Sequence, residues 1–492
     1  MKVYSLYEST LTNSKLEELL FMLCLNYKLE GRILMKLRDD FYWRNSVSSM
    51  QTEGAWNEGG KGKSVYDIRE ASENISDWKV ATDSYHRYQE DFDYMQDLGM
   101  NMYRFQISWS RVNPEGNGEW NEEGIAFYDQ FIDELIARGI EPMVCLYHYD
   151  MPLHLAEKYN GFIAKEVVDA FIRYGKEMVD RFGHKVKHWL TFNEQNIFSM
   201  PDEGFVISGY LTGERTLEKL YQIQHNTMVC HASVANYIHE TTDAQIGGML
   251  VYHEVYPATS HPEDIRLARE FDEFMNHHYL EMYTHGKRPE SYLKFIENRQ
   301  IDLTITEDEL SEIAKQRSDY LTFSYYSSTT IDHTHVPENA VPNEYMQFGK
   351  KDNPYIDTTE WNWQIDPDGF RDILNKIYQR YHLPVFPIEN GIGVIEEWDG
   401  EHPIEDDYRI AYHKEHLLAL MKAVNQDGVD VLGYLGWGLI DILSSQGDMR
   451  KRYGVVYVNR ENHDLKDLKR VPKKSYNWLK QVIHSNGDYL LK

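Results

Sequence analysis

Two glutamates, Glu194 and Glu389, occupy matching positions in this chain and could carry chemistry together. Each follows a short apolar run: residues 383–388 lead into Glu389, while HWLTF at 188–192 and then Asn193 lead into Glu194. Such runs, with proline and glycine nearby, are typical of buried parallel strands, so both carboxylates are expected at carboxyl ends of strands. A single glutamate there is usually a solvated charge. Two at one rim are the minimum needed to cleave a glycosidic bond, one as acid and one as nucleophile.

The elements that must position these glutamates are strands and helices in alternation. Amphipathic helices are predicted at 83–98, with Asp83 able to cap the start and Gly99 the end, and at 125–138, 164–182 and 407–427. Between the helices lie eight strand-like runs, at residues 45–51, 100–109, 141–150, 186–194, 245–253, 319–327, 384–390 and 431–438.

Eight strand and helix repeats predict an α/β protein with a single (β/α)8 TIM barrel and long loops after the strands. A doubly wound sheet is the alternative, but no phosphate-binding glycine loop follows the first strand. GIGVIE at 391–396 also lacks the third glycine of a dinucleotide fingerprint. We assign the barrel to residues 35–492, because the pattern starts only after Met35. Residues 1–34 are treated as an N-terminal extension whose status the sequence leaves open.

The composition limits the partners that this chain can have. Its 492 residues carry a net charge of −28, which makes nucleic acid and anionic membranes poor partners. The apolar stretch at 19–25 is too short to span a membrane, and no cleavage site follows it, so a cytoplasmic protein is expected. The cysteines are few, odd in number and far apart, as expected for reduced thiols: Cys24, Cys145 and Cys230.

The sequence contains no metal-binding motif such as His-Glu-x-x-His. The adjacent His277 and His278 are expected to lie at the surface. We therefore expect neither a metal ion nor a cofactor.

Side chains at the carboxyl ends of barrel strands converge on one pocket. Taken singly, Arg104 could pair with a buried carboxylate and His148 could be a core histidine. Taken together, amides and an imidazole can bind hydroxyl groups, and an indole offers a stacking face for a sugar. The polar and aromatic residues expected at these ends are Gln51, Arg104, His148, Asn193, Tyr326 and Trp437.

The two glutamates are expected to differ in their pKa values. A cation and a phenol near Glu389, supplied by Arg104 and Tyr326, would lower its pKa and keep it ionised as a nucleophile. Glu194 has no such partner evident in the sequence, so its pKa could stay raised and it could donate a proton.

From about Phe41 to the C-terminus the chain resembles the family-1 glycoside hydrolases. The matching segments are SMQTEGAW (49–56), YRFQISWSR (103–111), LYHYDMP (146–152), TFNEQN (191–196), FSYY (323–326), IENG (388–391) and GWG-x-x-D (436–441). TFNE and ENG in this order are highly specific to that family. The resemblance implies a retaining mechanism in which Glu389 attacks the anomeric carbon while Glu194 protonates the leaving group and later deprotonates water. It also implies that Asn193 binds the 2-hydroxyl of the sugar, and that Gln51 and His148 bind other hydroxyls.

Three residues depart from the usual family pattern. Ser324 replaces an asparagine and Tyr149 replaces a tryptophan, and both changes resemble the 6-phospho-glycosidase branch. Arg44 stands where glycine is usual after the Phe-x-Trp opening, and the sequence offers no explanation for it.

The loop after the eighth strand, at residues 437–454, indicates the substrate. Ordinary family members have a glutamate and a tryptophan where this chain has Ser444 and Ser445, and Lys451 and Tyr453 follow. This is similar to the Ser-x6-Lys-x-Tyr pattern of 6-phospho-glycosidases. A phosphate carries a charge of about −1.5 to −2, and a carboxylate ~4 Å away would cost on the order of 4 kcal/mol per unit charge. We therefore expect Ser444, Lys451 and Tyr453 to bind a phosphate. The alternative is a solvated loop with a chance Lys-Arg pair.

The sequence thus predicts a retaining 6-phospho-β-glucosidase whose partner is a phosphorylated glycoside. In the resembling enzymes, a tryptophan at the position of Ser445 goes with galactoside 6-phosphates, so serine favours glucosides. A 6-phospho-β-galactosidase, a β-glucosidase for unphosphorylated substrates and a carbohydrate-binding protein without turnover stay open. Trp361 and Trp363 are candidate walls for the aglycone. The sequence does not fix the oligomeric state, and a homo-oligomer stays open.

Overall fold

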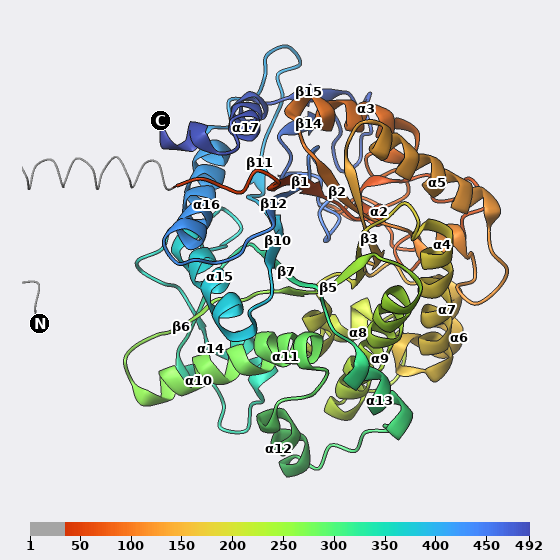
Figure 1. The fold of residues 1–492 in the computed structure, drawn as a ribbon, viewed down its shortest axis with the longest axis vertical. Helices are drawn as coiled ribbons and strands as arrows, with labels where there is room; N and C mark the ends of the chain where they lie inside the picture. Colours follow the sequence, from red (N-terminus) through yellow and green to blue (C-terminus); the bar gives the residue numbers. More distant parts are fainter. Residues whose placement is uncertain (1–34) are drawn as a thin grey trace, which may run out of the picture.

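The computed structural model describes residues 35–492, and the extension expected at residues 1–34 lies outside the described residues. Eight strands pair in parallel and surround a common centre, with helices outside them (Figure 1). The sheet closes between its two end strands, where Val385 and Val431 form a parallel bridge. The predicted (β/α)8 barrel is therefore confirmed. In chain order its strands are β1 (Tyr42–Ser46), β2 (Met102–Gln106), β3 (Glu141–Tyr147), β4 (His188–Phe192), β5 (Gln245–Val251), β7 (Tyr320–Tyr325), β10 (Val385–Asn390) and β12 (Gly433–Trp437).

Long helices cover the outside of the barrel and bury one apolar face each. In α7, Val167, Phe171, Tyr174 and Met178 recur at helical spacing and are all buried. The main covering helices are α3 (Ser84–Leu98), α5 (Glu122–Ala137), α7 (Lys165–Phe182), α9 (Leu217–Thr241), α15 (Pro367–Tyr381), α16 (Asp407–Asn425) and α17 (Lys474–His484).

The ends of α3 test the predicted caps. Gly99 ends the helix in the left-handed conformation, with φ of 81°, as predicted. Asp83 precedes the helix but makes no side-chain cap. Its carboxylate instead binds Nδ1 of His86 at 2.6 Å.

The first strand lies earlier in the chain than predicted. Residues 45–51 were expected to be extended, but β1 ends at Ser46, and Ser49–Thr52 form a helical turn, α2. The hydroxyl of Thr52 donates to the carbonyl of Ser48 at 2.7 Å, which is a local bond that competes with a strand. Gln51 therefore extends from a turn above the barrel and not from the strand itself.

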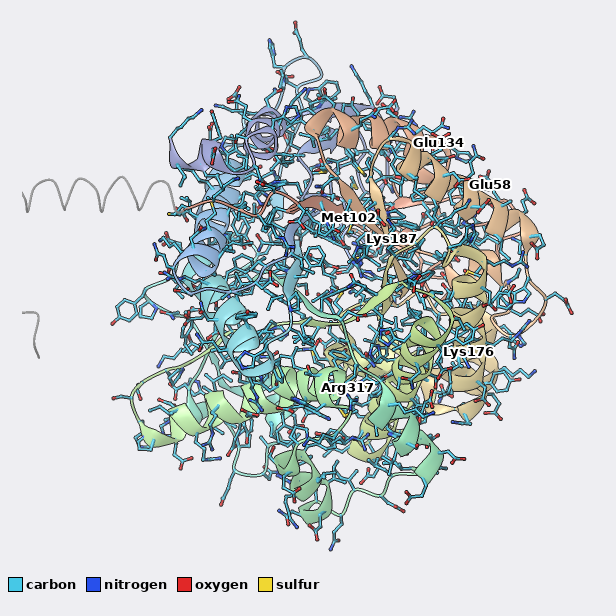
Figure 2. The ribbon with its side chains drawn as sticks, viewed as in Figure 1. Glu58, Met102, Glu134, Lys176, Lys187 and Arg317 are labelled. Carbon is cyan, nitrogen blue, oxygen red and sulfur yellow. The ribbon has the colours of Figure 1, made fainter. Side chains whose placement is uncertain are left out.

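The barrel interior is apolar near its middle, and charged side chains lie on the outer surface. Figure 2 shows Met102 near the middle of the molecule and Glu58, Glu134 and Lys176 near its outer edge. The residues that fill the interior include Met102, Met143, Cys145, Leu190, Met249, Phe386, Ile388 and Leu435.

Some buried polar groups were not expected. His277 and His278 are both buried, so the prediction of a surface pair is wrong. They follow the end of α10 (Pro262–Asp272) through a π-helical turn that packs them inward. Cys145 and Cys230 are buried free thiols, and Cys24 lies outside the described residues.

Arg44 lies inside the barrel, close to its floor. Its guanidinium is 3.3 Å from the ring centre of Tyr42 and 4.2 Å from that of Phe386. Only 2% of Arg44 is exposed, and its side-chain nitrogens have no hydrogen-bond partner among the described residues. Glu141 and His188 nearby also each have one buried polar atom without a partner.

The loops that follow the strands build the mouth of the barrel. The loops after β5 and β7 form a small sheet of β6 (Val255–Pro257), β8 (Thr329–Ile331) and β9 (Lys350–Lys351). The loops after β10 and β12 are joined by antiparallel pairing of β11 (Val394–Ile395) with β13 (Lys451–Arg452). Within residues 35–492, no helix is both long and apolar enough to cross a membrane.

Candidate active site

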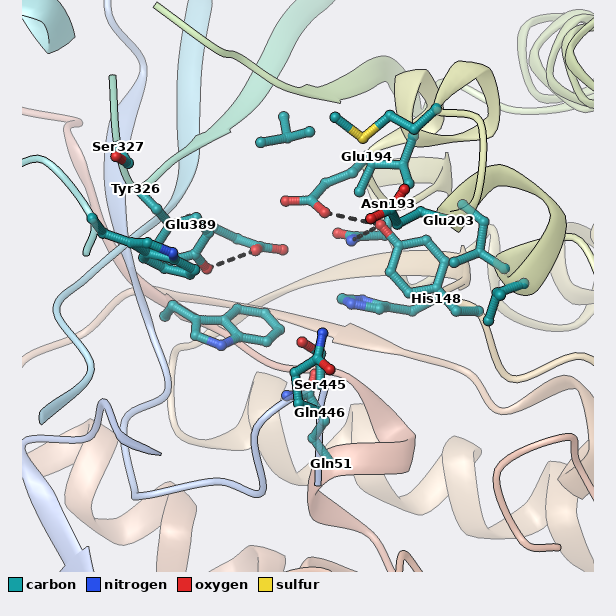
Figure 3. Close-up of a pocket in the computed structure, with 18 of the residues that line it drawn as sticks. Gln51, His148, Asn193, Glu194, Glu203, Tyr326, Ser327, Glu389, Ser445 and Gln446 are labelled. Carbon is teal, nitrogen blue, oxygen red and sulfur yellow. Dashed lines mark hydrogen bonds between the residues drawn. The ribbon is translucent and has the colours of Figure 1, made fainter. Parts of the chain in front are cut away.

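A cavity of about 740 Å³ opens at the carboxyl ends of the barrel strands. Glu194 and Glu389 both point into it from opposite sides (Figure 3). The structure thus brings most of the residues predicted from the sequence into one cavity. The predicted residues that line it are Gln51, His148, Asn193, Glu194, Tyr326, Glu389, Trp437 and Tyr453.

Glu389 is held by a cation and a phenol, as expected. Nη1 of Arg104 lies 2.6 Å from one carboxylate oxygen, and the hydroxyl of Tyr326 donates to the other at 2.9 Å. Burial nevertheless raises the pKa of Glu389 to about 8; Arg104 lowers it, the charge of Glu194 raises it, and Tyr326 lowers it. The prediction of a lowered pKa is therefore wrong for this cavity, because loss of hydration outweighs both partners.

Glu194 adopts a backbone conformation that is rare for residues with a side chain. Its φ of 39° lies in the left-handed region, which costs on the order of 1–3 kcal/mol. Tyr149 donates to one carboxylate oxygen at 2.9 Å and Ser324 donates to the other. Burial raises the pKa of Glu194, and the two hydroxyls and Arg104 partly offset this. The raised pKa agrees with the prediction, but the expected lack of partners was wrong.

Arg104 lies beneath the cavity and does not line it, although we grouped it with the substrate-binding residues expected at the strand ends. It is fully buried on β2, where Nη1 also donates to Ser46 at 3.0 Å. Nη2 donates to Oδ1 of Asn193 at 2.7 Å, and Nδ2 of Asn193 donates to the hydroxyl of Tyr149 at 3.0 Å. One guanidinium is therefore connected to both glutamates.

His148, Trp437 and Gln51 form one wall of the cavity. The rings of His148 and Trp437 stack at 5.7 Å, and burial followed by the charge of Arg104 lowers the pKa of His148 well below its usual value. His148 is therefore neutral and able to bind a hydroxyl group. The Gln51 amide donates to the carbonyl of Leu443 at 2.6 Å and accepts from Ser48 at 2.7 Å, which fixes its orientation.

Of the three predicted phosphate ligands, only Tyr453 lines the cavity. Ser444 is buried and its hydroxyl accepts from the backbone N–H of Asp448 at 2.9 Å, within a turn of the loop. The next two residues, Ser445 and Gln446, reach the cavity instead. The sequence pattern predicted which loop borders the cavity, but it did not predict which serine of that loop faces the cavity.

Lys451 lies against aromatic rings that border the cavity. Its ammonium nitrogen is 3.5 Å from the ring centre of Trp363 and 5.7 Å from that of Tyr453. Burial lowers the pKa of Lys451 to about 8, and the charge of Asp448 acts in the opposite direction. No carboxylate within residues 35–492 forms an ion pair with this lysine. Trp363 lines the cavity, whereas Trp361 does not.

From the sequence, Tyr149 and Ser324 were identified only as departures from a family pattern, and no role was predicted for them. The structure places both hydroxyls on Glu194. Their position within the segments LYHYDMP (146–152) and FSYY (323–326) was the available signal. The cavity lining also includes Tyr66 and Trp78 from loops and Glu203 from the short helix α8 (Glu203–Ile207), and none of these segments carries a motif.

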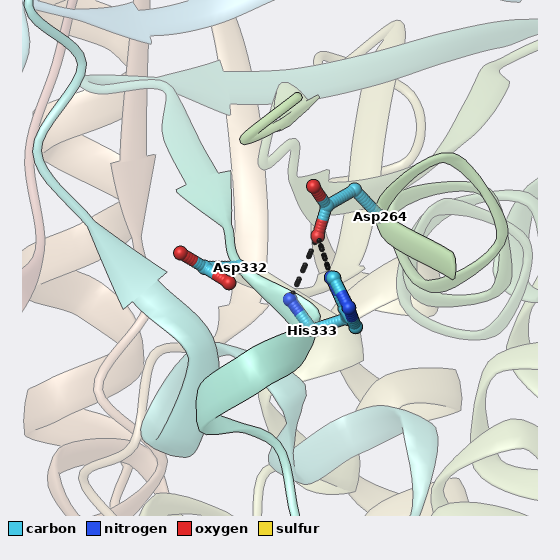
Figure 4. Close-up of side chains that lie close together, drawn as sticks. All are labelled: Asp264, Asp332 and His333. Carbon is cyan, nitrogen blue, oxygen red and sulfur yellow. Dashed lines mark hydrogen bonds and ion pairs between the residues drawn. The ribbon is translucent and has the colours of Figure 1, made fainter. Parts of the chain in front are cut away.

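Asp264, Asp332 and His333 lie close enough together to suggest a metal centre (Figure 4). Their groups are already bonded within the chain. Asp264 accepts from the backbone N–H of His333 at 2.8 Å and bonds its ring at 2.6 Å, and Asp332 pairs with Lys351 at 2.8 Å. These bonds explain the cluster as a link between helix α10 and the segment that follows β8.

The chain was compared with known protein families, curated proteins and solved structures. Residues 34–488 match the model of the family described as Glycosyl hydrolase family 1. The chain is 38% identical to the aryl-phospho-beta-D-glucosidase BglA of Bacillus subtilis, over 92% of this chain and 99% of that protein. It is 37% identical to a 6-phospho-beta-glucosidase of Clostridium longisporum, over 92% of this chain and 98% of that protein. It is also similar to the beta-glucosidase of Thermotoga maritima in complex with glucoimidazole, with a TM-score of 0.82, 31% identity and coverage of 92% and 100% of the two chains.

Proposed function

Because the chain belongs to glycosyl hydrolase family 1, we propose that it hydrolyses 6-phospho-β-D-glucosides with retention, releasing glucose 6-phosphate and an aglycone. The observation that carries this proposal is the ammonium of Lys451 beside a cavity that holds two glutamates. This cation is partly withdrawn from water and has no carboxylate partner within residues 35–492. A phosphate on the substrate would supply the missing charge. Relatives named as phospho-β-glucosidases support the same substrate class.

The two glutamates would act in two steps. In the first, the carboxylate of Glu389 attacks the anomeric carbon while Glu194 gives its proton to the departing glycosidic oxygen, which leaves a glycosyl ester on Glu389. In the second, Glu194 takes a proton from water as the water attacks the same carbon and displaces Glu389. Two inversions at one carbon retain its configuration.

Two features of the cavity act against the raised pKa of Glu389 and favour the starting state of this mechanism. The charge of Glu194 is one cause of the raised pKa of Glu389, so a proton on Glu194 removes that contribution. Arg104 contacts Glu389 directly at 2.6 Å and reaches Glu194 only through other side chains. A single proton shared by the pair therefore favours a neutral Glu194 and an ionised Glu389.

Discrimination between phosphorylated and free substrates tests the proposal. Hydrogen bonds to charged groups contribute about 1.5–3 kcal/mol each, so kcat/KM for 4-nitrophenyl β-glucoside 6-phosphate should exceed that of the free glucoside at least about a hundredfold. Lys451→Ala should remove most of this ratio and leave hydrolysis of the free glucoside nearly unchanged. Ser445→Glu, at the serine that lines the cavity, should penalise the phosphorylated substrate further by repulsion.

Lys350 offers a matched control, since it lines the same cavity from β9 on the opposite loops. Lys350→Ala removes an equal charge and should preserve the ratio between the two substrates. Equal kcat/KM on both substrates in the wild type would contradict the proposal and leave an ordinary β-glucosidase.

We also propose a preference for glucosides over galactosides. Ser445 lines the cavity and is small, which leaves space for an equatorial 4-hydroxyl and a water molecule. The wild type should show higher kcat/KM on the gluco 6-phosphate, and Ser445→Trp should narrow or reverse the preference. An equal or higher value on the galacto compound in the wild type would count against it.

A cytoplasmic location follows as a further part of the proposal. A phosphorylated glycoside carries about −1.5 to −2 charge and does not cross a bilayer unaided, so its hydrolase is expected where the phosphate is added. Cell fractionation with activity on the phosphorylated substrate checks this, and activity confined to the culture medium would exclude it.

A further inference from the structure

Both carboxylate oxygens of Glu194 have a hydrogen-bond donor that lies at or near the end of another strand of the barrel. Tyr149, at the end of β3, occupies one carboxylate oxygen, and Ser324, on β7, occupies the other. Both are hydrogen-bond donors, and donors stabilise the ionised form of a carboxylate. Tyr149 has a left-handed φ of 71°, like Glu194 itself, so two strained residues meet in one hydrogen bond.

The direction of each hydrogen bond in this region is fixed by Arg104. A guanidinium can only donate, so the amide oxygen of Asn193 must face it, at 2.7 Å. The amide nitrogen of Asn193 then faces the hydroxyl of Tyr149, at 3.0 Å, and it too can only donate. The oxygen of Tyr149 accepts that bond, so its own proton is left to point at Glu194.

We propose that Tyr149 and Ser324 are positioning residues for Glu194, and that the hydrogen-bond chain from Arg104 through Asn193 to Tyr149 sets how readily this glutamate releases and recovers its proton. The inference rests on the proposed function, because it assigns Glu194 a proton that must leave in one step and return in the next. In this proposal, residues other than the two glutamates regulate the protonation of Glu194.

Opposing demands on Glu194 explain the need for such control. Burial raises its pKa, which keeps the proton available for the leaving group. The same carboxyl must be ionised in the second step to accept a proton from water. The two hydroxyls partly offset the effect of burial, so that both forms are accessible. The other charged and titratable groups near Glu194 are Arg104, Glu389, Tyr326 and Tyr453, and they stay unchanged when only the two hydroxyls are removed.

The test is the pH dependence of kcat/KM in Tyr149→Phe and Ser324→Ala. The basic limb reports loss of the proton from Glu194. Removing a donor destabilises the ionised form and raises this pKa, so the limb should move to higher pH by about one unit in each variant. Ser324→Thr keeps a hydroxyl and should leave the limb at the wild-type position.

Leaving groups provide a second measurement. Loss of positioning should lower kcat/KM about tenfold for alkyl or sugar aglycones, which need the proton. It should have a smaller effect for 2,4-dinitrophenyl β-glucoside 6-phosphate, whose leaving group needs none. A loss that is uniform across leaving groups would assign the two hydroxyls to substrate binding and overturn the inference.

Two hydroxyls on the same strands act as controls. Tyr147 on β3 donates to the carbonyl of Ile207 at 2.6 Å, and Thr322 on β7 donates to that of Gly248 at 2.9 Å. Neither contacts Glu194, so Tyr147→Phe and Thr322→Val should leave the basic limb in place. If these controls shift the limb as far as Tyr149→Phe does, the inference fails.

Direct titration separates this inference from the proposed function. The carboxyl band of Glu194 can be followed by infrared difference between the wild type and Glu194→Gln, without turnover. A higher pKa for Glu194 in Tyr149→Phe and Ser324→Ala is expected, and an unchanged pKa would overturn the inference. Absence of activity on every phosphorylated glycoside would instead overturn the function alone.

Discussion

Two arginines are buried inside the same barrel, and they are held in opposite ways. Arg104, at the mouth, donates to Ser46, Glu389 and Asn193. Arg44 lies two positions below Ser46 on β1 and has no hydrogen-bond partner among the described residues, only the rings of Tyr42 and Phe386. Burial lowers the pKa of Arg44 well below its usual value. At Arg104 burial also lowers the pKa, but Cys145 and Glu389 raise it more.

The difference shows what a buried charge requires. Taking an ion out of water costs several kcal/mol even in real proteins. At the mouth of the barrel this cost is offset by acceptors, and the charge is used to hold Glu389 and Asn193. At the floor the contact with aromatic rings offsets only about 2 kcal/mol. We therefore infer that Arg104 serves the proposed active site, whereas the burial of Arg44 costs the fold more than its ring contacts return.

The largest expected effect is at the mouth, on the nucleophile. Glu389→Ala should lower kcat by about 10⁴-fold or more, because no other group can form the glycosyl ester. Added azide should restore part of the turnover and give an α-configured glycosyl azide. Glu194→Ala should keep more activity on substrates with good leaving groups. A wild-type product of inverted configuration, seen by NMR, would rule out this mechanism.

Arg104→Met should have the next largest effect. It leaves Glu389 buried without its cation, which costs about 3–5 kcal/mol of unfolding free energy. It also removes a cause that lowers the pKa of Glu389, so the acid limb of kcat/KM should move to higher pH. Urea unfolding and a pH profile measure the two effects. An acid limb that stays in place would mean that Arg104 does not act on Glu389.

The matched change at the floor, Arg44→Met, should change the free energy of unfolding in the opposite direction. It replaces an unpaired buried charge with an apolar side chain of similar length. The free energy of unfolding should rise by about 1–4 kcal/mol, while kcat/KM stays within about twofold. A loss of stability would show that Arg44 has a partner, such as an ordered water shared with Glu141, and would end the contrast with Arg104.

The smallest effect is expected at the start of the chain. It tests which N-terminal residues the floor of the barrel needs for stability. We propose that residues 1–34 are dispensable, because the family match begins at residue 34. A chain that starts at Met35 should keep its activity and its Tm within about 2 °C. A chain that starts at Trp43 is the control, since it loses the buried Leu37 and Phe41 and should be clearly less stable. A large drop in Tm for the first chain would assign residues 1–34 to the core.

The barrel and the two glutamates could be predicted because their signals are local. Apolar runs and glycine-ended helices repeat along the chain, and each strand end carries its functional residue within one short segment. The first strand was misplaced because polar side chains after Ser46 make local hydrogen bonds that stabilise a turn, namely Ser48 to Gln51 and Thr52 to the carbonyl of Ser48. These polar residues end the strand within residues 45–51, a run that was predicted to be extended throughout.

The sequence by itself predicted the fold, the two glutamates that we propose as the catalytic pair, and the loop that we propose contacts a phosphate. Only the tertiary structure decided how those groups are partnered. Tyr149 and Ser324 reach Glu194 from 45 and 130 residues away, and Arg104 reaches Glu389 across 285 residues. Burial of the cavity raises the pKa values of both glutamates, and among residues 35–492 Arg44 contacts two rings but has no hydrogen-bond partner. These properties depend on distance, hydration and orientation in space, which the spacing of residues along the chain does not contain.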